Sequence, residues 1–186
     1  ARRSAQTALH HITQQLVRLM APVLSFTAEE VWATLNPGKD VTEASVFFEV
    51  YNQPLPSPAD EAVLLDRWRK IRAVRAIVVT KAIEDLRVTG AIGSSLQADI
   101  VVQAHEDDLQ AELTRLGDEL KFVFITSQVA VTRGNELKVT VAPSAATKCD
   151  RCWHYRSDVG SDAAHAGLCA RCISNLYGAG ETRTFA

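Results

Sequence analysis

The chain has 186 residues, of which 47% are hydrophobic and 23% are charged, as in an ordinary globular protein of one or two domains. Its formal net charge is −2, so local basic patches, and not the field of the whole molecule, would have to meet a nucleic-acid partner. No apolar run approaches the ~20 residues that span a membrane and no signal peptide is visible, so we expect a cytoplasmic protein with no membrane partner.

Two helices are predicted near the start of the chain. Apolar residues recur at steps of three and four over residues 5–20, which predicts a helix with one buried face, ended by Pro22. The members of this stripe are Ala5, Leu9, Ile12, Leu16, Leu19 and Val23. Thr27 and Glu30 match a capping box, which predicts a second helix over residues 28–35.

Residues 36–60 are predicted to be a connection that contains a short extended segment, residues 46–51. The prolines expected to stiffen its end are Pro54, Pro56 and Pro58. Ser57 is the predicted cap of a long third helix, residues 59–88, which ends before Gly90.

This third helix carries an apolar stripe with a basic edge beside it. The stripe consists of Leu64, Trp68, Ile71, Val74, Val78, Ala82 and Leu86. Arg75 projects into the stripe, so its guanidinium is expected to meet a carboxylate or to reach out at the edge of the bundle. For the basic edge formed by Arg67, Lys70 and Lys81, a solvated face is the favoured interpretation.

After Gly93 the sequence pattern changes to that of a small α/β unit. Strands are predicted at residues 98–103, 122–126, 129–133 and 137–142, with a helix at residues 106–116. Gly134 and Asn135 are predicted to form a turn, and residues 143–147 a linker into the last module.

All four cysteines lie in two Cys-x2-Cys pairs, Cys149 with Cys152 and Cys169 with Cys172, and sixteen residues separate the pairs. This spacing predicts one structural zinc ion, because each turn points two thiolates at the same ion and four thiolates leave no position for a catalytic water. Zinc would stabilise a module too small to bury a sufficient core. Two disulfides or a redox pair are weaker interpretations.

Two histidines, His154 and His165, lie between the cysteine pairs and are potential alternative ligands. A position at the surface or beside the ligands is the favoured interpretation for both. No catalytic residue is predicted, because the chain has no phosphate-binding loop, no dinucleotide fingerprint and no G-x-S-x-G elbow.

Several stretches resemble the C-terminal region of bacterial isoleucyl-tRNA synthetases, which are class I aminoacyl-tRNA synthetases. Residues 19–32 and 68–87 resemble helices of the anticodon-binding domain, and residues 92–98 resemble the loop that follows. The zinc element of that family is similar to residues 148–155, 169–172 and 180–186. The departures are Ser25, where the family usually has proline, and Gln97, where glutamate is expected.

The resemblance implies a mainly α fold, with a class I anticodon-binding helical bundle (residues 1–95), a small α/β subdomain (96–143) and a four-cysteine zinc ribbon or knuckle (144–186). The parent enzyme attaches isoleucine to tRNA(Ile) using ATP. ATP and isoleucine would bind only in a catalytic domain that this chain lacks, so we expect an inactive fragment whose partners are tRNA(Ile) and the remainder of the synthetase. We expect a monomer.

On this interpretation the zinc module places aromatic and basic side chains close together for unstacked bases and phosphates. The candidate tRNA-binding residues are Arg75, Lys148, Arg151, Trp153, Tyr155, Arg156 and Arg171. Two alternatives stay open: Trp153 packs as a miniature core on the zinc knuckle, and the arginines offset the charge of the four thiolates.

Two other functions are considered for the zinc module. A similar four-cysteine finger ends the formamidopyrimidine-DNA glycosylases, but the two-helix module and the proline-initiated N-terminus of that family are not seen. The second alternative is a zinc-stabilised protein-interaction module that binds no nucleic acid.

Overall fold

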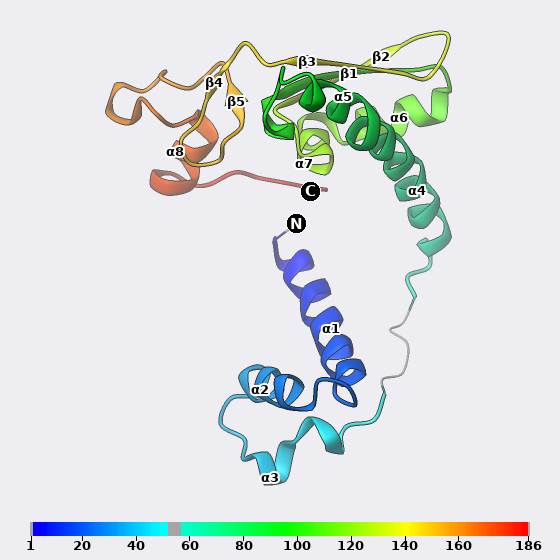
Figure 1. Ribbon diagram of the computed structural model, residues 1–186, viewed down its shortest axis with the longest axis vertical. Helices are drawn as coiled ribbons and strands as arrows, with labels where there is room; N and C mark the ends of the chain where they lie inside the picture. The colour runs from blue at the N-terminus through cyan, green and yellow to red at the C-terminus, as the bar shows by residue number, and fades with distance from the viewer. Residues whose placement is uncertain (1, 52–56, 186) are drawn as a thin grey trace. The chain divides into compact units, whose positions relative to one another are not determined.

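The computed structural model describes residues 2–51 and 57–185, and the chain divides between residues 58 and 59 into two units (Figure 1). The predicted domain boundaries at residues 95 and 143 are a different division and stay predictions. Pro54 and Pro56, expected to stiffen the connection, lie outside the described residues. Among the helices of the described ranges, none is both long and apolar enough to cross a membrane.

The first unit contains α1 (Arg2–Met20), α2 (Ser25–Leu35), α3 (Val41–Ala44) and a 3-10 turn at Val46–Phe48. Its core consists of Val17, Ala21, Ala28, Trp32 and Val46. These side chains come from every part of the unit except α3, so α1, α2 and the 3-10 turn share one small core.

Polar contacts around Trp32 hold the first unit together. The indole N–H of Trp32 donates to the carbonyl of Ala44 at 2.6 Å. The Arg18 guanidinium lies 4.7 Å from the Trp32 ring centroid and forms an ion pair with Glu49 at 2.8 Å. α1 is thereby tied to the segment that follows α3.

The capping box predicted for α2 is not formed. The helix begins at Ser25, its N-cap is Leu24, and no side chain caps it, so Thr27 lies inside the helix. The reason is the tight turn after α1, in which the backbone N–H of Leu24 donates to the carbonyl of Met20 at 2.8 Å and Ser25 already continues a helical path.

The apolar stripe of α1 is also not buried as predicted. Its central members, Leu9, Ile12, Leu16 and Leu19, are 51% to 62% exposed. The buried residue of this helix is Val17, which lies beside the stripe and faces Trp32 and its neighbours in the core.

The extended segment predicted at residues 46–51 is wrong in its first half. Val46–Phe48 form a 3-10 turn, because the side chain of Ser45 accepts a hydrogen bond from the backbone N–H of Phe47 at 3.2 Å. This local cap overrides the β-propensity of the Val-Phe-Phe run.

One long helix opens the second unit. It consists of α4 (Glu61–Ile77), a π-helical segment (Val78–Ile83) and α5 (Glu84–Val88), which ends before Gly90 as predicted. The predicted Ser57 cap is wrong, since the N-cap is Asp60 and no side chain caps the helix.

The predicted apolar stripe of this helix is confirmed in part, because in the π-helical segment Ile83 is buried in the core and the predicted Ala82 is not. Ile71, Val74 and Val78 are buried, and Trp68 and Leu86 pack against the same core. The stripe faces the sheet of the second unit and its covering helices (Figure 1).

The sheet has three strands: β1 (Ala98–Ala104), β2 (Gln128–Arg133) and β3 (Lys138–Pro143). β1 lies in the centre, parallel to β2 and antiparallel to β3. Helices α6 (Asp107–Arg115) and α7 (Leu120–Phe124) connect β1 to β2 and lie on the same face of the sheet as the long helix (Figure 1).

Burial follows the pleat of this central strand. Ala98, Ile100, Val102 and Ala104 are buried, whereas the residues between them point to the other, more exposed face. Every second residue of β1 therefore faces the core, in agreement with the alternation that predicted the strand.

One prediction for this region is wrong. Residues 122–126 are not a strand: α7 covers the first three of them, and the helix ends where Ile125 adopts a left-handed backbone conformation with φ 58°. Phe124 is completely buried, so its position in the core decides the conformation of a run that is apolar at almost every position. The chain turns at Gly134 and Asn135 as predicted, and β2 and β3 are not paired with each other because β1 lies between them.

The last module contains β4 (Thr147–Lys148), β5 (Tyr155–Arg156) and α8 (Ala170–Tyr177). The backbone N–H of Tyr155 donates to the Ser127 hydroxyl oxygen at 2.5 Å, which joins β5 to the start of β2. Beyond α8 the chain runs back to α7 (Figure 1).

Candidate metal centre

The first cysteine pair lies on a turn between β4 and β5. The backbone N–H of Trp153 donates to the Cys149 carbonyl, and the Cys149 N–H donates to the His154 carbonyl, both at 2.9 Å. Trp153 itself has φ 63°, a left-handed conformation that is uncommon for a bulky residue. These contacts fold the turn so that Cys149 and Cys152 point the same way.

The second pair lies at the start of α8. Cys169 is the N-cap of this helix and Cys172 lies in its first turn, so the helix fixes their spacing. The backbone N–H of Cys169 points at the sulfur of Cys149 at 3.4 Å. Cys149, Cys169 and Cys172 are completely buried, and together they form the centre of the module's small core.

The four sulfur atoms lie within 4.8 Å of one another. The Sγ atoms of Cys152 and Cys169 are 3.7 Å apart, too far for a disulfide, and all four cysteines are free. Tetrahedral zinc with Zn–S bonds of about 2.3 Å requires sulfurs about 3.8 Å apart. The donor set and its geometry therefore fit a zinc ion.

The electrostatics of the cluster point in the same direction. Burial raises the pKa of Cys149, but backbone N–H groups of the two cysteine turns outweigh burial and bring its pKa to about 6. Burial raises the pKa of Cys169 to about 12. Without a cation Cys169 would therefore stay a neutral thiol, whereas a divalent metal would hold all four cysteines as thiolates.

Neither histidine joins the group of four sulfurs. The ring of His154 meets that of Phe122 edge-on at 5.5 Å, and its Nδ1 lies 3.1 Å from the carbonyl oxygen of Cys152. His165 stacks on Tyr177 at 4.2 Å. Both rings lie beside the cluster and pack against other aromatic rings.

Three of the candidate RNA-binding residues gather on the turn of the first cysteine pair. Trp153 is 59% exposed, so it is not a miniature core, and the Lys148 ammonium lies 5.6 Å from the centroid of its ring. The exposed Arg151 donates to the sulfur of Cys172 at 3.6 Å. The turn thus carries an exposed aromatic ring and two cations. Of the two cations, Arg151 also offsets the charge of the Cys172 thiolate.

The other candidates lie apart from this turn. Arg75 is half-buried and donates from Nε to the carbonyl of Val123 at 2.8 Å, so the partner of this nitrogen is a backbone oxygen and not the expected carboxylate. Tyr155 is half-buried in β5. Arg156 pairs with Asp158 at 3.1 Å.

The predicted basic edge of the long helix is partly paired. Arg67 forms an ion pair with Glu112 at 2.7 Å, and Lys70 forms one with Asp108 at 2.5 Å. Lys81 is exposed. This arrangement agrees with the favoured interpretation of a surface edge for Lys70 and Lys81.

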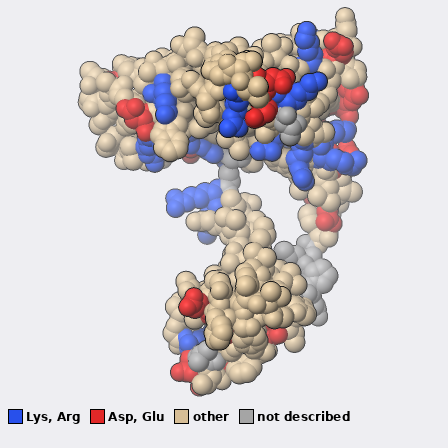
Figure 2. Space-filling view, viewed as in Figure 1, with Lys and Arg blue, Asp and Glu red and all other residues tan. Residues whose placement is uncertain are grey.

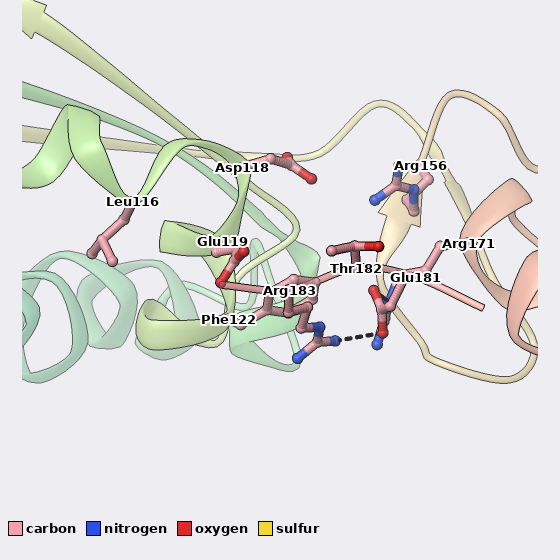
Figure 3. Close-up of a pocket in the computed structure, with 9 residues that line it drawn as sticks. All are labelled: Leu116, Asp118, Glu119, Phe122, Arg156, Arg171, Glu181, Thr182 and Arg183. Carbon is pink, nitrogen blue, oxygen red and sulfur yellow. Dashed lines mark hydrogen bonds and ion pairs between the residues drawn. The ribbon is translucent and has the colours of Figure 1, made fainter. Parts of the chain in front are cut away.

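A pocket near α7 was not predicted (Figure 3). It brings Arg156 and Arg171 together with Phe122, Glu181 and Arg183. These residues come from four segments of the chain, namely α7, β5, α8 and the closing stretch, and have no common spacing, so no sequence pattern marks the pocket. The closing stretch that carries Glu181 and Arg183 was singled out by resemblance alone.

Basic side chains occur in separate groups on the surface, as expected for a chain with a net charge of −2 (Figure 2). Figure 2 shows Lys and Arg side chains of residues 59–185 at several separate places, interspersed with acidic side chains on the face in view. On this face a polyanion would therefore meet separate clusters of basic side chains and not one continuous basic surface.

Comparison with known proteins agrees with the fold and with the cysteine cluster. Residues 1–102 match the family model described as the anticodon-binding domain of tRNA ligase, so the chain belongs to this family. Residues 147–175 match the model described as the zinc finger found in FPG and IleRS.

Within that family the chain is similar to isoleucine–tRNA ligases. The identity is 53% to the enzyme of Bordetella avium, 54% to that of Thiobacillus denitrificans and 52% to that of Azoarcus sp.. These alignments cover 98%, 100% and 100% of this chain. The chain spans 19% to 20% of the length of these relatives.

Proposed function

We propose that the chain is the tRNA-binding C-terminal part of an isoleucine–tRNA ligase and grips the anticodon arm of tRNA(Ile). The observation that carries this proposal is the match of residues 1–102 to an anticodon-binding domain, combined with identity above 50% to isoleucine–tRNA ligases over nearly the whole chain. In this proposal the parent enzyme activates isoleucine with ATP in a domain that the 186 residues do not contain.

The same two family matches bear on the glycosylase and protein-interaction alternatives. The zinc-finger match alone fits a glycosylase tail equally well, since that finger is described for both kinds of protein. The first half of the chain discriminates, because it matches a tRNA-ligase domain. A module that binds only protein does not account for an anticodon-binding domain and a zinc finger in the same chain.

In the proposed assembly one zinc ion is held by Cys149, Cys152, Cys169 and Cys172. Four thiolates supply structural ligation and no catalytic position. The support is the geometry of the four sulfur atoms, which lie within 4.8 Å of one another.

For RNA contact, the proposal favours Trp153 with Lys148 and Arg151 beside it. An exposed ring with the Lys148 ammonium over its face suits an unstacked base, and Arg151 on the same turn offers a charge to a phosphate. Arg156 and Arg171 are proposed as a second group of contacts. Arg75 is proposed to support the fold of α7 rather than to touch RNA, because it already binds a backbone carbonyl.

The parts are proposed to act as an anticodon-binding bundle (residues 1–95), an α/β subdomain (96–143) and a zinc module (144–186). We further propose that the chain is monomeric, since RNA binding by these clusters needs no second copy.

Titration of the chain with tRNA(Ile), with a tRNA of another anticodon and with a duplex DNA, each at two salt concentrations, tests the function. We expect tRNA(Ile) to bind most tightly, with an affinity that falls as salt rises. Preference for the duplex would favour the glycosylase alternative, and binding of none of the three would favour the interaction module.

A further inference from the structure

A pocket of about 350 Å³ lies where the zinc module meets α7 and the end of the chain (Figure 3). Its lining residues are Leu116, Asp118, Glu119, Phe122, Arg156, Arg171, Glu181, Thr182 and Arg183. Three guanidinium groups thus line one small cavity.

Two of these cations lie against one aromatic ring. The guanidinium carbon of Arg183 is 3.8 Å from the centroid of Phe122, and that of Arg171 is 4.8 Å from it. Contact with the ring orients both groups without neutralising their charge. Phe122 therefore serves as the support on which the two cations are displayed.

The Glu181 carboxylate bridges the same two cations. One of its oxygens accepts from Nε of Arg171 at 2.6 Å, and the other lies 3.0 Å from a terminal nitrogen of Arg183. Burial raises the pKa of Glu181, but hydrogen bonds from the two arginines outweigh burial and hold the pKa at about 2. An oxyanion with two oxygens thus lies between two guanidinium groups, as a phosphate would.

The other acidic residues of the pocket have different partners. Asp118 pairs with Lys121, and the two oxygens of Glu119 accept from the backbone N–H groups of Thr184 and Phe185 at 2.6 Å. Glu181 contacts both arginines that lie over Phe122.

The backbone at Glu181 is held independently of its carboxylate. Its N–H donates to the side-chain oxygen of Asn175 at 2.9 Å, and the backbone beyond it is bound by Glu119. The carboxylate can rotate out of the pocket while these bonds keep the closing segment in place. Its side chain retains 27% exposure, so water is available to solvate it when it leaves.

We propose that Arg171 and Arg183 form a phosphate subsite for RNA, which the Glu181 carboxylate occupies until an RNA phosphate displaces it. This inference rests on the proposed function, because that function supplies the RNA. The internal anion keeps the two cations oriented and lowers the affinity for stray anions. A phosphate offers the two guanidinium groups more oxygens and more negative charge than one carboxylate does, so it can replace the Glu181 carboxylate.

Binding of a simple anion at the subsite can be measured before binding of RNA. Inorganic phosphate is titrated into the chain while the Nε–H signals of Arg171 and Arg183 are followed by NMR. Glu181→Gln removes the internal anion and should tighten phosphate binding about threefold or more. The matched control is Asp118→Asn, which removes one charge from the same pocket without freeing an arginine pair, and it should change the affinity by less than about 1.5-fold.

A double variant tests whether the gain depends on Arg183 or on a change in the structure of the closing segment. Glu181→Gln combined with Arg183→Gln should lose the gain, while the amide signal of residue 181 reports that its bond to Asn175 persists. Unchanged or weaker phosphate binding by Glu181→Gln, or an equal gain in the Asp118→Asn control, would overturn the subsite.

The same variants are then titrated with an anticodon stem-loop RNA. Tighter binding of both phosphate and RNA by Glu181→Gln supports the whole inference. Tighter binding of phosphate, with no RNA binding by any variant, keeps the anion subsite but overturns its assignment to RNA together with the proposed function. RNA binding by the wild type without any gain in Glu181→Gln leaves the proposed function standing and overturns the displacement.

Discussion

At the scale of single residues, Trp153 combines three features that a packing role does not require. It is largely exposed, it lies beside the Lys148 ammonium, and its backbone has the left-handed conformation that turns its ring outward from the cysteine turn. A core tryptophan would be covered by apolar side chains, whereas a ring that stacks on a base has to be open on one face.

Replacement of Trp153 by alanine should weaken tRNA(Ile) binding by about 1–3 kcal/mol, because one base loses its stacking partner. Zinc content should not change, since the sulfur ligands stay in place. Trp153→Phe is the matched control and should keep most of the affinity, because a phenyl ring still stacks. Full affinity in Trp153→Ala would make this residue a bystander. Affinity is measured by fluorescence anisotropy of labelled tRNA.

The Glu181 carboxyl group should stay ionised at a pH at which an ordinary glutamate is largely protonated. Its folded-state pKa of about 2 lies below the ordinary value of 4.5, so its contribution to stability is present above pH 4.5 and is lost as the pH falls toward 2. At a pH of about 4 its carboxylate should still be ionised. The carbon-13 shift of the carboxyl group measures this. Arg183→Gln should move the midpoint upward, and a midpoint near 4.5 in the wild type would contradict the bridging geometry.

At the scale of elements, the zinc module has hardly any core beyond its sulfurs. Cys149, Cys169 and Cys172 are its buried centre, with Val159 and Leu168 partly buried around them. The sheet and its helices, in contrast, share a large apolar core that includes Ile100, Leu113 and Phe124. The two regions should therefore respond differently to loss of metal.

Chelation should unfold residues 148–177 while β1 keeps its protection against hydrogen exchange, since ligation and not apolar burial holds the module. Cys172→Ser should reproduce the effect, and His165→Ala should retain about one zinc per chain, because His165 lies outside the group of four sulfurs. Metal analysis and exchange mass spectrometry measure both. Retained protection over residues 148–177 after complete chelation would contradict this account.

The elements that the sequence predicted well are those with a long or specific pattern. The spacing of the cysteines, the alternation of residues 98–103 in β1 and most of the stripe of the long helix match the structure. Short elements were less predictable, because tertiary contacts decide them: Phe124 belongs to a helix through its place in the core. The pocket at Phe122 and Glu181 could not be predicted, since it assembles residues that are far apart in the chain.

At the scale of the whole molecule, two units with separate cores are combined with a net charge of −2. Such a chain has no long-range attraction for a polyanion, so binding depends on clusters such as the one at Trp153. Specific recognition is compatible with this arrangement, because local contacts discriminate and a weak overall field reduces non-specific binding.

The last prediction concerns catalysis by the 186-residue chain. The chain carries no motif for binding ATP, and it spans about a fifth of the length of the isoleucine–tRNA ligases that it resembles. It should therefore show no isoleucine-dependent exchange of pyrophosphate into ATP, even where it binds tRNA(Ile). An intact isoleucine–tRNA ligase serves as the positive control, and a Cys172→Ser sample purified in parallel reports contamination by the host enzyme. Exchange above that background, in proportion to the amount of chain, would mean that the chain contains a nucleotide site that neither its motifs nor its fold indicates.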